Sequence, residues 1–197
     1  MTNELRIVVA DDEPEMRDFF EKALPRFGHQ VVAVAENGVQ LVEHCRQLRP
    51  DLVITDIKMP ELDGIEASGQ ICKERPVPVI LVSAYHDPEL IARAEADHVL
   101  AYLVKPIGIA DLQPAISIAV RRFKGLRILQ YECKNLQQAL ADRKVIERAK
   151  GVLMKLAGID ENETFKRLQD LASEKNQKLI DAAQSVLAIE KAVAPRK

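Results

Sequence analysis

The amino-acid sequence predicts a doubly wound α/β domain followed by a wholly helical region. In the first 120 of its 197 residues, short runs of Val, Ile and Leu alternate with longer amphipathic stretches. Strands that alternate with helices form βαβ units and therefore a parallel sheet, and nearly continuous apolar strands indicate a sheet covered on both faces. Five such strand–helix pairs are typical of a flavodoxin-like, five-stranded domain.

Each predicted strand is short, rich in apolar and β-branched residues, and bounded by polar or turn residues. The five strands are expected at residues 5–10, 30–35, 51–55, 77–82 and 100–104. Between them, apolar residues recur at helical spacing on one side of each segment. These segments predict helices at residues 14–24, 39–48, 65–72 and 88–96.

From residue 111 the strand pattern stops and a long helix is predicted over 111–143. Pro114 falls in its first turn, where proline is tolerated. An apolar seam then recurs at alternating steps of three and four residues, which predicts a coiled coil and a homodimer. The alternative is a single helix that packs this stripe against its own chain. The seam residues are Leu126, Leu129, Cys133, Leu136 and Leu140.

Three shorter amphipathic segments follow, and the first of them ends at Ala157-Gly158, a typical helix stop. They predict helices at residues 145–156, 163–173 and 178–194. We therefore expect three parts in the chain. These are an α/β domain at 1–120, a helical linker at 111–142, and a small three-helix domain at 143–197.

Composition narrows the class of protein. The longest apolar runs are far too short to cross a bilayer, and no secretion signal opens the chain, so we expect a cytoplasmic protein without a membrane partner. Cys45, Cys72 and Cys133 are scattered and lack the spacing of a zinc site or a disulfide frame. They are interpreted as buried thiols in a reducing compartment.

The net charge of −2 hides two halves of opposite sign. Residues 1–120 hold 11 Lys and Arg against 20 Asp and Glu, a net charge of −9, whereas residues 121–197 hold 17 against 10, a net charge of +7. This split indicates two modules with different partners. The basic half suits a polyanion, with a merely solvated helical surface as the alternative.

Polar side chains stand where the predicted strands end. Asp11 and Asp12 follow the first strand, Asp56 the third, Ser83 the fourth and Lys105 the fifth. Ligands of open α/β sheets bind outside the carboxyl ends of the strands, so we expect these groups to converge on one edge.

The expected grouping predicts phosphoryl chemistry. Three neighbouring carboxylates repel one another unless a cation joins them, and Mg²⁺ is a hard cation that takes oxygen ligands. Such an ion orients an incoming phosphoryl group and neutralises its charge while a carboxylate attacks. A lysine opposite pairs with one phosphoryl oxygen, and a small hydroxyl donates to another.

These residues resemble the receiver domain of response regulators. The resemblance implies that Asp56 accepts a phosphoryl group from a sensor histidine kinase. It also implies that Ser83 is the switch hydroxyl and Tyr102 the switch aromatic. The motifs that carry it are "VVADDE" at 8–13, "DLVITDIKMPELDG" at 51–64, "VILVSAY" at 79–85 and "AYLVKP" at 101–106.

The same resemblance implies a magnesium site. Asp12, Asp56 and the backbone carbonyl of Lys58 would bind the ion, and Asp11 would contribute through water. Lys105 would contact the phosphoryl group, and the Lys105–Pro106 peptide bond would be cis, an isomer that only X–Pro bonds reach at low cost.

Residues 143–187 contain three motifs, "ERAKGVLM" at 147–154, "TFKRLQDLA" at 164–172 and "KLIDAA" at 178–183. With these motifs the segment resembles the ANTAR domain, a three-helix output module of antitermination proteins. Thr164 stands where the family usually has alanine, and Ser173 where it often has methionine. The resemblance implies binding to hairpins in nascent RNA.

Helical periodicity predicts a small apolar core in this tail, which includes Leu156 and Phe165. If Met154 also belongs to this core, Met154→Ala should destabilise the module by about 2–5 kcal/mol. Ala149 and Gly151 are small, which predicts close helix packing at both positions. The basic residues are expected on the outside, where they would contact phosphates of a structured RNA. They are Lys144, Arg148, Lys150, Lys155, Lys175 and Lys178.

Together the two resemblances imply a two-component response regulator, not an enzyme, that controls transcription antitermination through RNA. Two other functions stay open. A DNA-binding regulator would need a tight turn before its recognition helix, whereas residues 157–162 form a longer linker. A protein-interaction adaptor would use the helical tail only to dimerise.

Overall fold

A computed structural model of the chain describes residues 4–84 and 99–193. The chain divides into two compact units, which we call the sheet unit, Met1–Arg127, and the helical unit, Ile128–Lys197. Three predicted features lie outside the described residues. They are the helix at 88–96, Tyr85 at the end of the motif at 79–85, and residue 194 of the last predicted helix.

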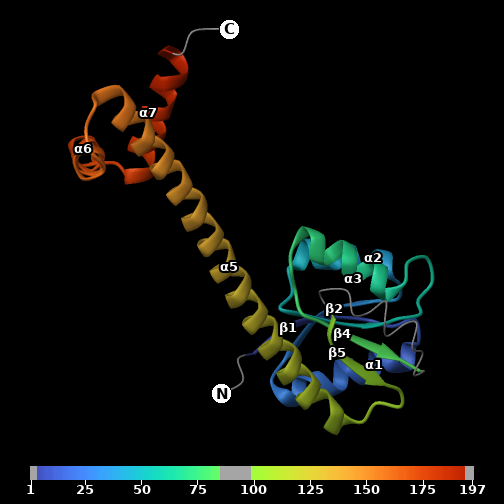
Figure 1. Cartoon of the computed structure of the whole chain (residues 1–197). Coiled ribbons are helices and arrows are strands. Elements are labelled where there is room, and N and C mark those ends of the chain that lie inside the picture. Colours follow the sequence, from blue (N-terminus) through green and yellow to red (C-terminus); the bar gives the residue numbers. More distant parts are fainter. Residues whose placement is uncertain (1–3, 85–98, 194–197) are drawn as a thin grey trace. The chain divides into compact units, whose positions relative to one another are not determined.

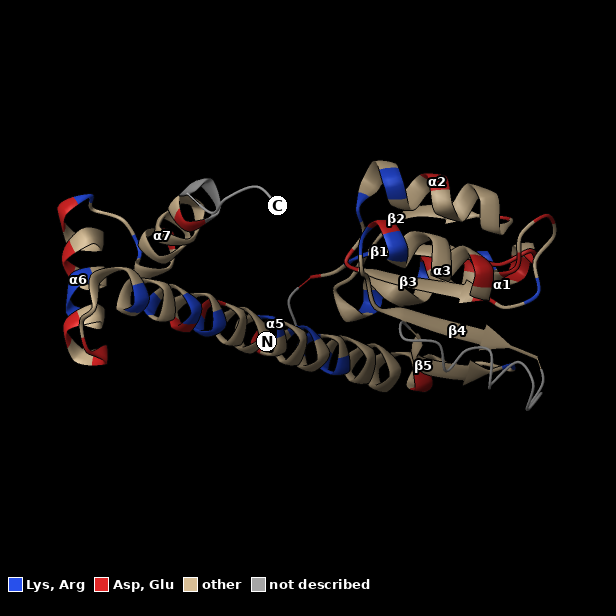
Figure 2. Cartoon of the chain, turned by 45° about the horizontal axis from the view of Figure 1, so that its top comes forward, with Lys and Arg blue, Asp and Glu red and all other residues tan. Residues whose placement is uncertain are grey.

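The sheet unit contains a five-stranded, fully parallel sheet with the strand order β2-β1-β3-β4-β5. This is a flavodoxin-like order, and it reverses between β1 and β3. The arrowheads of β3, β4 and β5 in Figure 2 all point toward one edge of the sheet. The strands are β1 (Arg6–Ala10), β2 (Gln30–Ala35), β3 (Leu52–Asp56), β4 (Val79–Ser83) and β5 (Val99–Val104).

Helices cover both faces of this sheet, as predicted (Figure 1). The described helices of the sheet unit differ from the predicted bounds by one or two residues. The predicted helix over 14–24 ends one residue early, because a short 3-10 turn follows it. The described helices of the sheet unit are α1 (Pro14–Ala23), η1 (Leu24–Phe27), α2 (Gly38–Leu48), α3 (Gly64–Glu74) and the first part of α5 (Ile109–Ala157).

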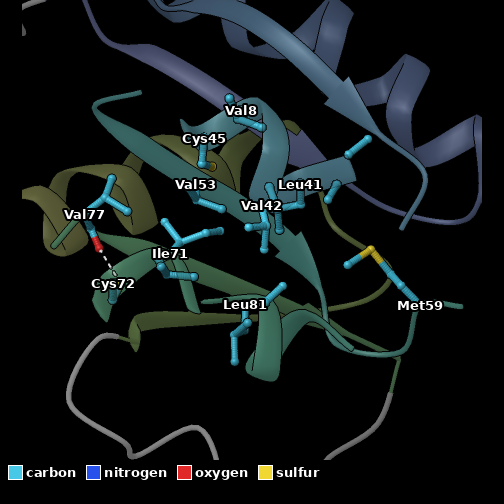
Figure 3. Close-up of a cluster of buried hydrophobic side chains, with 14 of the residues drawn as sticks. Val8, Leu41, Val42, Cys45, Val53, Met59, Ile71, Cys72, Val77 and Leu81 are labelled. Carbon is cyan, nitrogen blue, oxygen red and sulfur yellow. Dashed lines mark hydrogen bonds between the residues drawn. The ribbon is translucent and has the colours of Figure 1, made fainter. Parts of the chain in front are cut away.

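Alternate residues of each strand point to opposite faces of the sheet, so their side chains belong to two separate hydrophobic cores. On one face, Val8, Val53 and Leu81 pack against α2 and α3 (Figure 3). On the other face, Ile7, Val9, Ile54 and Val82 pack against α1 and the start of α5. Central strands β3 and β4 are buried along their whole length, which explains their continuous apolar sequence.

Cys45 and Cys72 are buried between α2, α3 and the sheet, and burial raises the pKa of Cys45 to about 12. The expectation of a buried thiol is wrong for Cys133, which is exposed on α5. Cys133 is exposed because it lies on a part of α5 whose seam is itself exposed, as the neighbouring Leu129, Leu136 and Leu140 show.

Helix α5 is continuous from Ile109 to Ala157, so the predicted helices at 111–143 and 145–156 are one element. Neither Gly nor Pro interrupts it at 143–145, and Arg143 and Lys144 are good helix formers. It ends before Gly158, whose φ of 64° is the left-handed conformation of a helix stop. No described helix combines the length and the apolar character needed to span a membrane.

The helical unit closes with α6 (Glu161–Glu174) and α7 (Leu179–Val193). Asp160 caps α6, because its side chain accepts a hydrogen bond from the Glu163 backbone N–H. The core of the unit is small and consists of Ala149, Val152, Leu168, Ala183 and Val186, with half-buried apolar neighbours.

Two residues predicted for this core lie outside it, because Leu156 is 67% and Phe165 39% exposed. The condition set for Met154 is not met either, since it is 37% exposed. Helical periodicity selects a side of a helix, but the side is buried only as far as neighbouring helices reach. Leu156 stands one residue before the end of α5.

Candidate phosphoacceptor site and output surface

The polar residues at the strand ends meet at one edge of the sheet. Lys105, just after β5, places its Nζ 3.1 Å from Asp56 Oδ1 at the end of β3. The same Nζ lies 3.1 Å from Asp11 Oδ2 and 3.0 Å from Glu13 Oε1. Asp11 and Asp56 are buried, whereas Asp12 and Glu13 are exposed.

Backbone groups hold the Asp56 carboxylate in place. Its Oδ2 accepts a 2.8 Å hydrogen bond from the Lys58 N–H. The loop then folds back, because the Gly64 N–H donates to the Ile57 carbonyl and Asp63 caps α3. A Cβ at Gly64 would lie 2.0 Å from the Asp56 carbonyl oxygen, so glycine is needed for this close approach.

The loop after β1 is held from within α1. Asp11 Oδ1 accepts a hydrogen bond from the Glu13 N–H. Arg17 Nη1 donates to the carbonyl oxygens of Asp11 and Asp12 at 2.8 and 2.9 Å. Sequence reasoning missed the parts played by Glu13 and Arg17. A local pattern could have identified both residues, because Glu13 is the third acid of "DDE" and Arg17 follows it after one helical turn.

Burial and pairing oppose each other in this pocket. Burial raises the pKa of the Asp56 carboxyl to about 6, although Lys105 acts to lower it. Burial likewise raises the pKa of Asp11. For Lys105, burial lowers the pKa, but hydrogen bonds to Glu13 and Asp11 and attraction to Asp56 outweigh it, so the pKa is raised overall. One lysine therefore does not fully compensate the buried carboxylates.

The acidic edge has the donor chemistry of a magnesium site. One carboxylate oxygen each from Asp11, Asp12 and Glu13 lies within 4.8 Å of the other two. Asp11 Oδ2 is buried; it lies 3.1 Å from Lys105 Nζ as an ion pair, but within the described part of the chain it accepts no hydrogen bond. Oxygen donors and uncompensated negative charge fit a hard divalent cation.

Two further predicted residues lie on the neighbouring strands. Ser83 is buried at the end of β4, and its carbonyl accepts a 2.8 Å hydrogen bond from the Lys105 N–H. Tyr102 is half-buried on β5 and packs against the α2–α3 core. The Lys105–Pro106 peptide bond is cis, as predicted.

The predicted RNA contacts of the helical unit do not share one environment. Five of the six are exposed, namely Lys144, Arg148, Lys155, Lys175 and Lys178. The expectation of exposure is wrong for Lys150, of which only 8% is accessible.

Lys150 is enclosed because α6 begins beside it. Its Nζ lies 2.6 Å from Glu161 Oε1 and 3.1 Å from Glu147 Oε1, and 5.9 Å from the centre of the Phe165 ring. Hydrogen bonds to Glu161 and Glu147 raise its pKa. Lys150 thus ties α6 to α5, and its charge is used within the chain.

Comparison with known proteins agrees with this division of the molecule. Residues 7–117 match the response regulator receiver domain, and residues 134–187 match the ANTAR domain. This chain belongs to the response-regulator family. We use "receiver domain" and "ANTAR domain" below for these two matched regions.

One relative of this response regulator matches almost its whole length. The transcriptional regulatory protein PdtaR of Mycobacterium tuberculosis is 38% identical over 92% of the chain and 89% of the relative. A protein-glutamate methylesterase/protein-glutamine glutaminase of Natronomonas pharaonis is also 38% identical, over 62% of the chain but only 37% of that protein.

The solved receiver domain of NarL from M. tuberculosis has the same fold. It superposes with a TM-score of 0.57 at 26% identity, and the match covers 61% of this chain and 98% of that one. The matches establish a two-component regulator with a receiver and an ANTAR domain.

Proposed function

We propose that this response regulator accepts a phosphoryl group on Asp56 from a sensor histidine kinase and controls transcription antitermination by binding hairpins in nascent RNA. It acts in the cytoplasm as a regulator and not as an enzyme. One observation carries the proposal: a lysine-linked acidic pocket at the sheet edge belongs to the same chain as an ANTAR domain with exposed basic residues, among them Arg148 and Lys155.

In the pocket, the Asp56 carboxylate would attack the phosphorus of the kinase phosphohistidine. The new P–O bond forms as the P–N bond breaks, and the histidine nitrogen keeps the electron pair. Lys105 would then move from its carboxylate partners to a phosphoryl oxygen, and the Ser83 hydroxyl would donate to another.

Asp11, Asp12, Asp56 and the carbonyl of Lys58 would hold magnesium. When bound, the ion supplies positive charge that neutralises the phosphoryl oxygens. Since it also favours ionised carboxylates, it would reverse the upward shift in the pKa of Asp56.

The exposed seam on α5 supports a homodimer. Leu129, Leu136 and Leu140 are 62%, 67% and 61% exposed, and they recur at the spacing of a coiled coil. We propose that two copies pair in parallel through this seam, which would place Cys133 opposite its counterpart.

Sedimentation tests the dimer. Leu129→Lys with Leu136→Lys should give a monomer, because a seam does not accommodate buried unpaired charges. Mild oxidation should link two wild-type chains through Cys133, and Cys133→Ser should not be linked. A dimer that persists in the double variant would place the interface elsewhere.

Titration of a hairpin RNA at several salt concentrations tests the function as a whole. Phosphorylated and unphosphorylated protein should differ in affinity, and Asp56→Asn should not respond to the phosphodonor. Affinity should fall steeply with salt because each neutralised phosphate releases condensed counterions. Equal affinity for duplex DNA of the same length would favour a DNA-binding regulator. Binding to neither would leave an adaptor.

A further inference from the structure

Gly151 lies inside α5, six residues before the helix ends at Ala157, without a packing reason. Ala149 is fully buried, as close packing requires. A Cβ at Gly151, however, would meet no atom of the described chain within 4 Å. The expectation that Gly151 permits close packing of helices within the chain is therefore wrong. A glycine inside a helix is destabilising relative to alanine, so the position carries a cost that the fold does not explain.

Basic side chains surround this glycine on one side of the helix. Lys144, Arg148, Gly151 and Lys155 follow one another at steps of four, three and four residues. At 3.6 residues per turn, these steps keep all four within an arc of about 60° around the helix axis. They form a single narrow line over three turns, which we call the basic stripe.

The charges of the basic stripe are not used within the chain. All three cationic side chains are exposed, and in the described part of the protein none has a hydrogen bond or ion pair. Nearby Lys150 and Arg167 differ, because each is paired with a glutamate. The stripe is thus a line of free positive charge with a gap where a side chain would be.

We propose that the sugar–phosphate backbone of the RNA crosses α5 at Gly151, with Arg148 and Lys155 on phosphates to either side. This inference rests on the proposed RNA binding and adds the position on α5 at which the RNA is bound. A missing Cβ lets the strand lie close to the helix axis, where two cations one turn away reach phosphate oxygens. A second copy of the chain fits this surface poorly, because the two stripes would repel each other.

The test replaces the gap with an uncharged side chain. Gly151→Gln adds bulk but no charge, and glutamine is a good helix former. Gly125→Gln is the matched control, because Gly125 is also in α5, also has no atom within 4 Å of its Cβ position, and lies outside the basic stripe. Both variants should melt at or above the wild-type temperature.

Fluorescence anisotropy with a hairpin RNA at low salt supplies the main readout. Gly151→Gln should weaken binding by about tenfold, the size of a lost contact, and should make the salt dependence shallower. Gly125→Gln should bind as the wild type does, and sedimentation should find the same oligomeric state for all three proteins.

Each other result has a distinct meaning. If Gly151→Gln binds normally while Arg148→Ala binds weakly, RNA binding stands and the crossing point is wrong. Equal weakening in both glutamine variants would assign the effect to helix stiffness and overturn the proposal. A wild-type protein that binds no hairpin would reject the proposed function itself, and the stripe with it.

Discussion

The receiver and ANTAR domains use charge in opposite ways. In the receiver domain, buried carboxylates surround one lysine at the edge of a fully covered sheet. In the ANTAR domain, a core cluster of five buried apolar residues supports exposed cations, and two of them, Arg148 and Lys155, have no partner in the described part of the chain. The comparison teaches that chemistry on a reacting group needs a pre-organised, partly dry pocket, whereas binding of a polyanion needs charges that are still free. The two domains should therefore respond differently to the same kind of substitution.

The largest effect is expected at the pocket itself. Asp56→Asn should abolish labelling by acetyl phosphate, because an amide is not a nucleophile. Asp51→Asn is the control, since Asp51 is exposed and lies at the opposite end of β3. Labelling is followed by intact mass or by phosphate-affinity electrophoresis. Undiminished labelling of Asp56→Asn would move the acceptor to another residue.

Core substitution in the ANTAR domain should come next. Leu168 is fully buried, so Leu168→Ala should lower the free energy of unfolding by about 2–5 kcal/mol. Met154→Ala, at a 37% exposed position, should cost less than about 1 kcal/mol. Denaturant titration monitored by circular dichroism measures both. A Met154 variant as unstable as the Leu168 variant would show that Met154 is covered, for example by a second chain.

Backbone crowding sharpens the comparison within the receiver domain. Gly64→Ala should destabilise the fold by about 1–3 kcal/mol, because its Cβ collides with the Asp56 carbonyl. It should also slow phosphorylation, since the collision is with the backbone of the acceptor residue itself, at the end of β3. Gly69→Ala in the same helix meets nothing within 4 Å and should stabilise by up to about 1 kcal/mol. Similar unfolding midpoints for the two variants would contradict the close approach at Gly64.

The smallest effect concerns His29, which is buried and whose ring nitrogens have no hydrogen-bond partner among the described residues. Burial lowers the pKa of His29. Below about pH 6.5 the unfolded state therefore binds a proton that the folded state does not, and stability is lost as pH falls. Asp56 acts with the opposite sign, because burial raises its pKa.

Comparison of variants isolates the histidine. Between pH 7 and pH 5, His29→Gln should lose less stability than the wild type, while the contribution of Asp56 is common to both. His44→Gln, at a half-buried position on α2, is the control. Parallel stability curves for wild type and His29→Gln would show that His29 does not contribute to the pH dependence.

Local patterns were enough to predict the sheet and the residues on its edge. Each strand is a short apolar run, and a parallel sheet brings the carboxyl ends of its strands together. The positions of Asp11, Asp56 and Lys105 follow from that rule. In the structure, Lys105 Nζ lies 3.1 Å from a carboxylate oxygen of each aspartate. The positions of these three residues at the ends of their strands were therefore enough to predict the pocket.

Local patterns were insufficient wherever the outcome depends on a neighbouring element. The break predicted between 143 and 145 is absent from α5, and Leu156 and Phe165 lie at the margin of a core too small to cover them. Helical periodicity identifies the apolar side of each segment but contains no measure of how far its neighbours extend.

By itself, the sequence determined which side chains this regulator has at its strand ends, because strand spacing and sheet topology are consequences of short-range pattern. Only the tertiary structure decided which cations stay free. Lys150 and Arg148 lie two residues apart on one helix, yet Lys150 is enclosed by Glu161 of α6 while Arg148 faces solvent. The physical reason is that Glu147 on the same helix supplies only one partner of Lys150. The second, Glu161, comes from the next helix, whose position depends on packing around Leu168 and not on the sequence near Lys150.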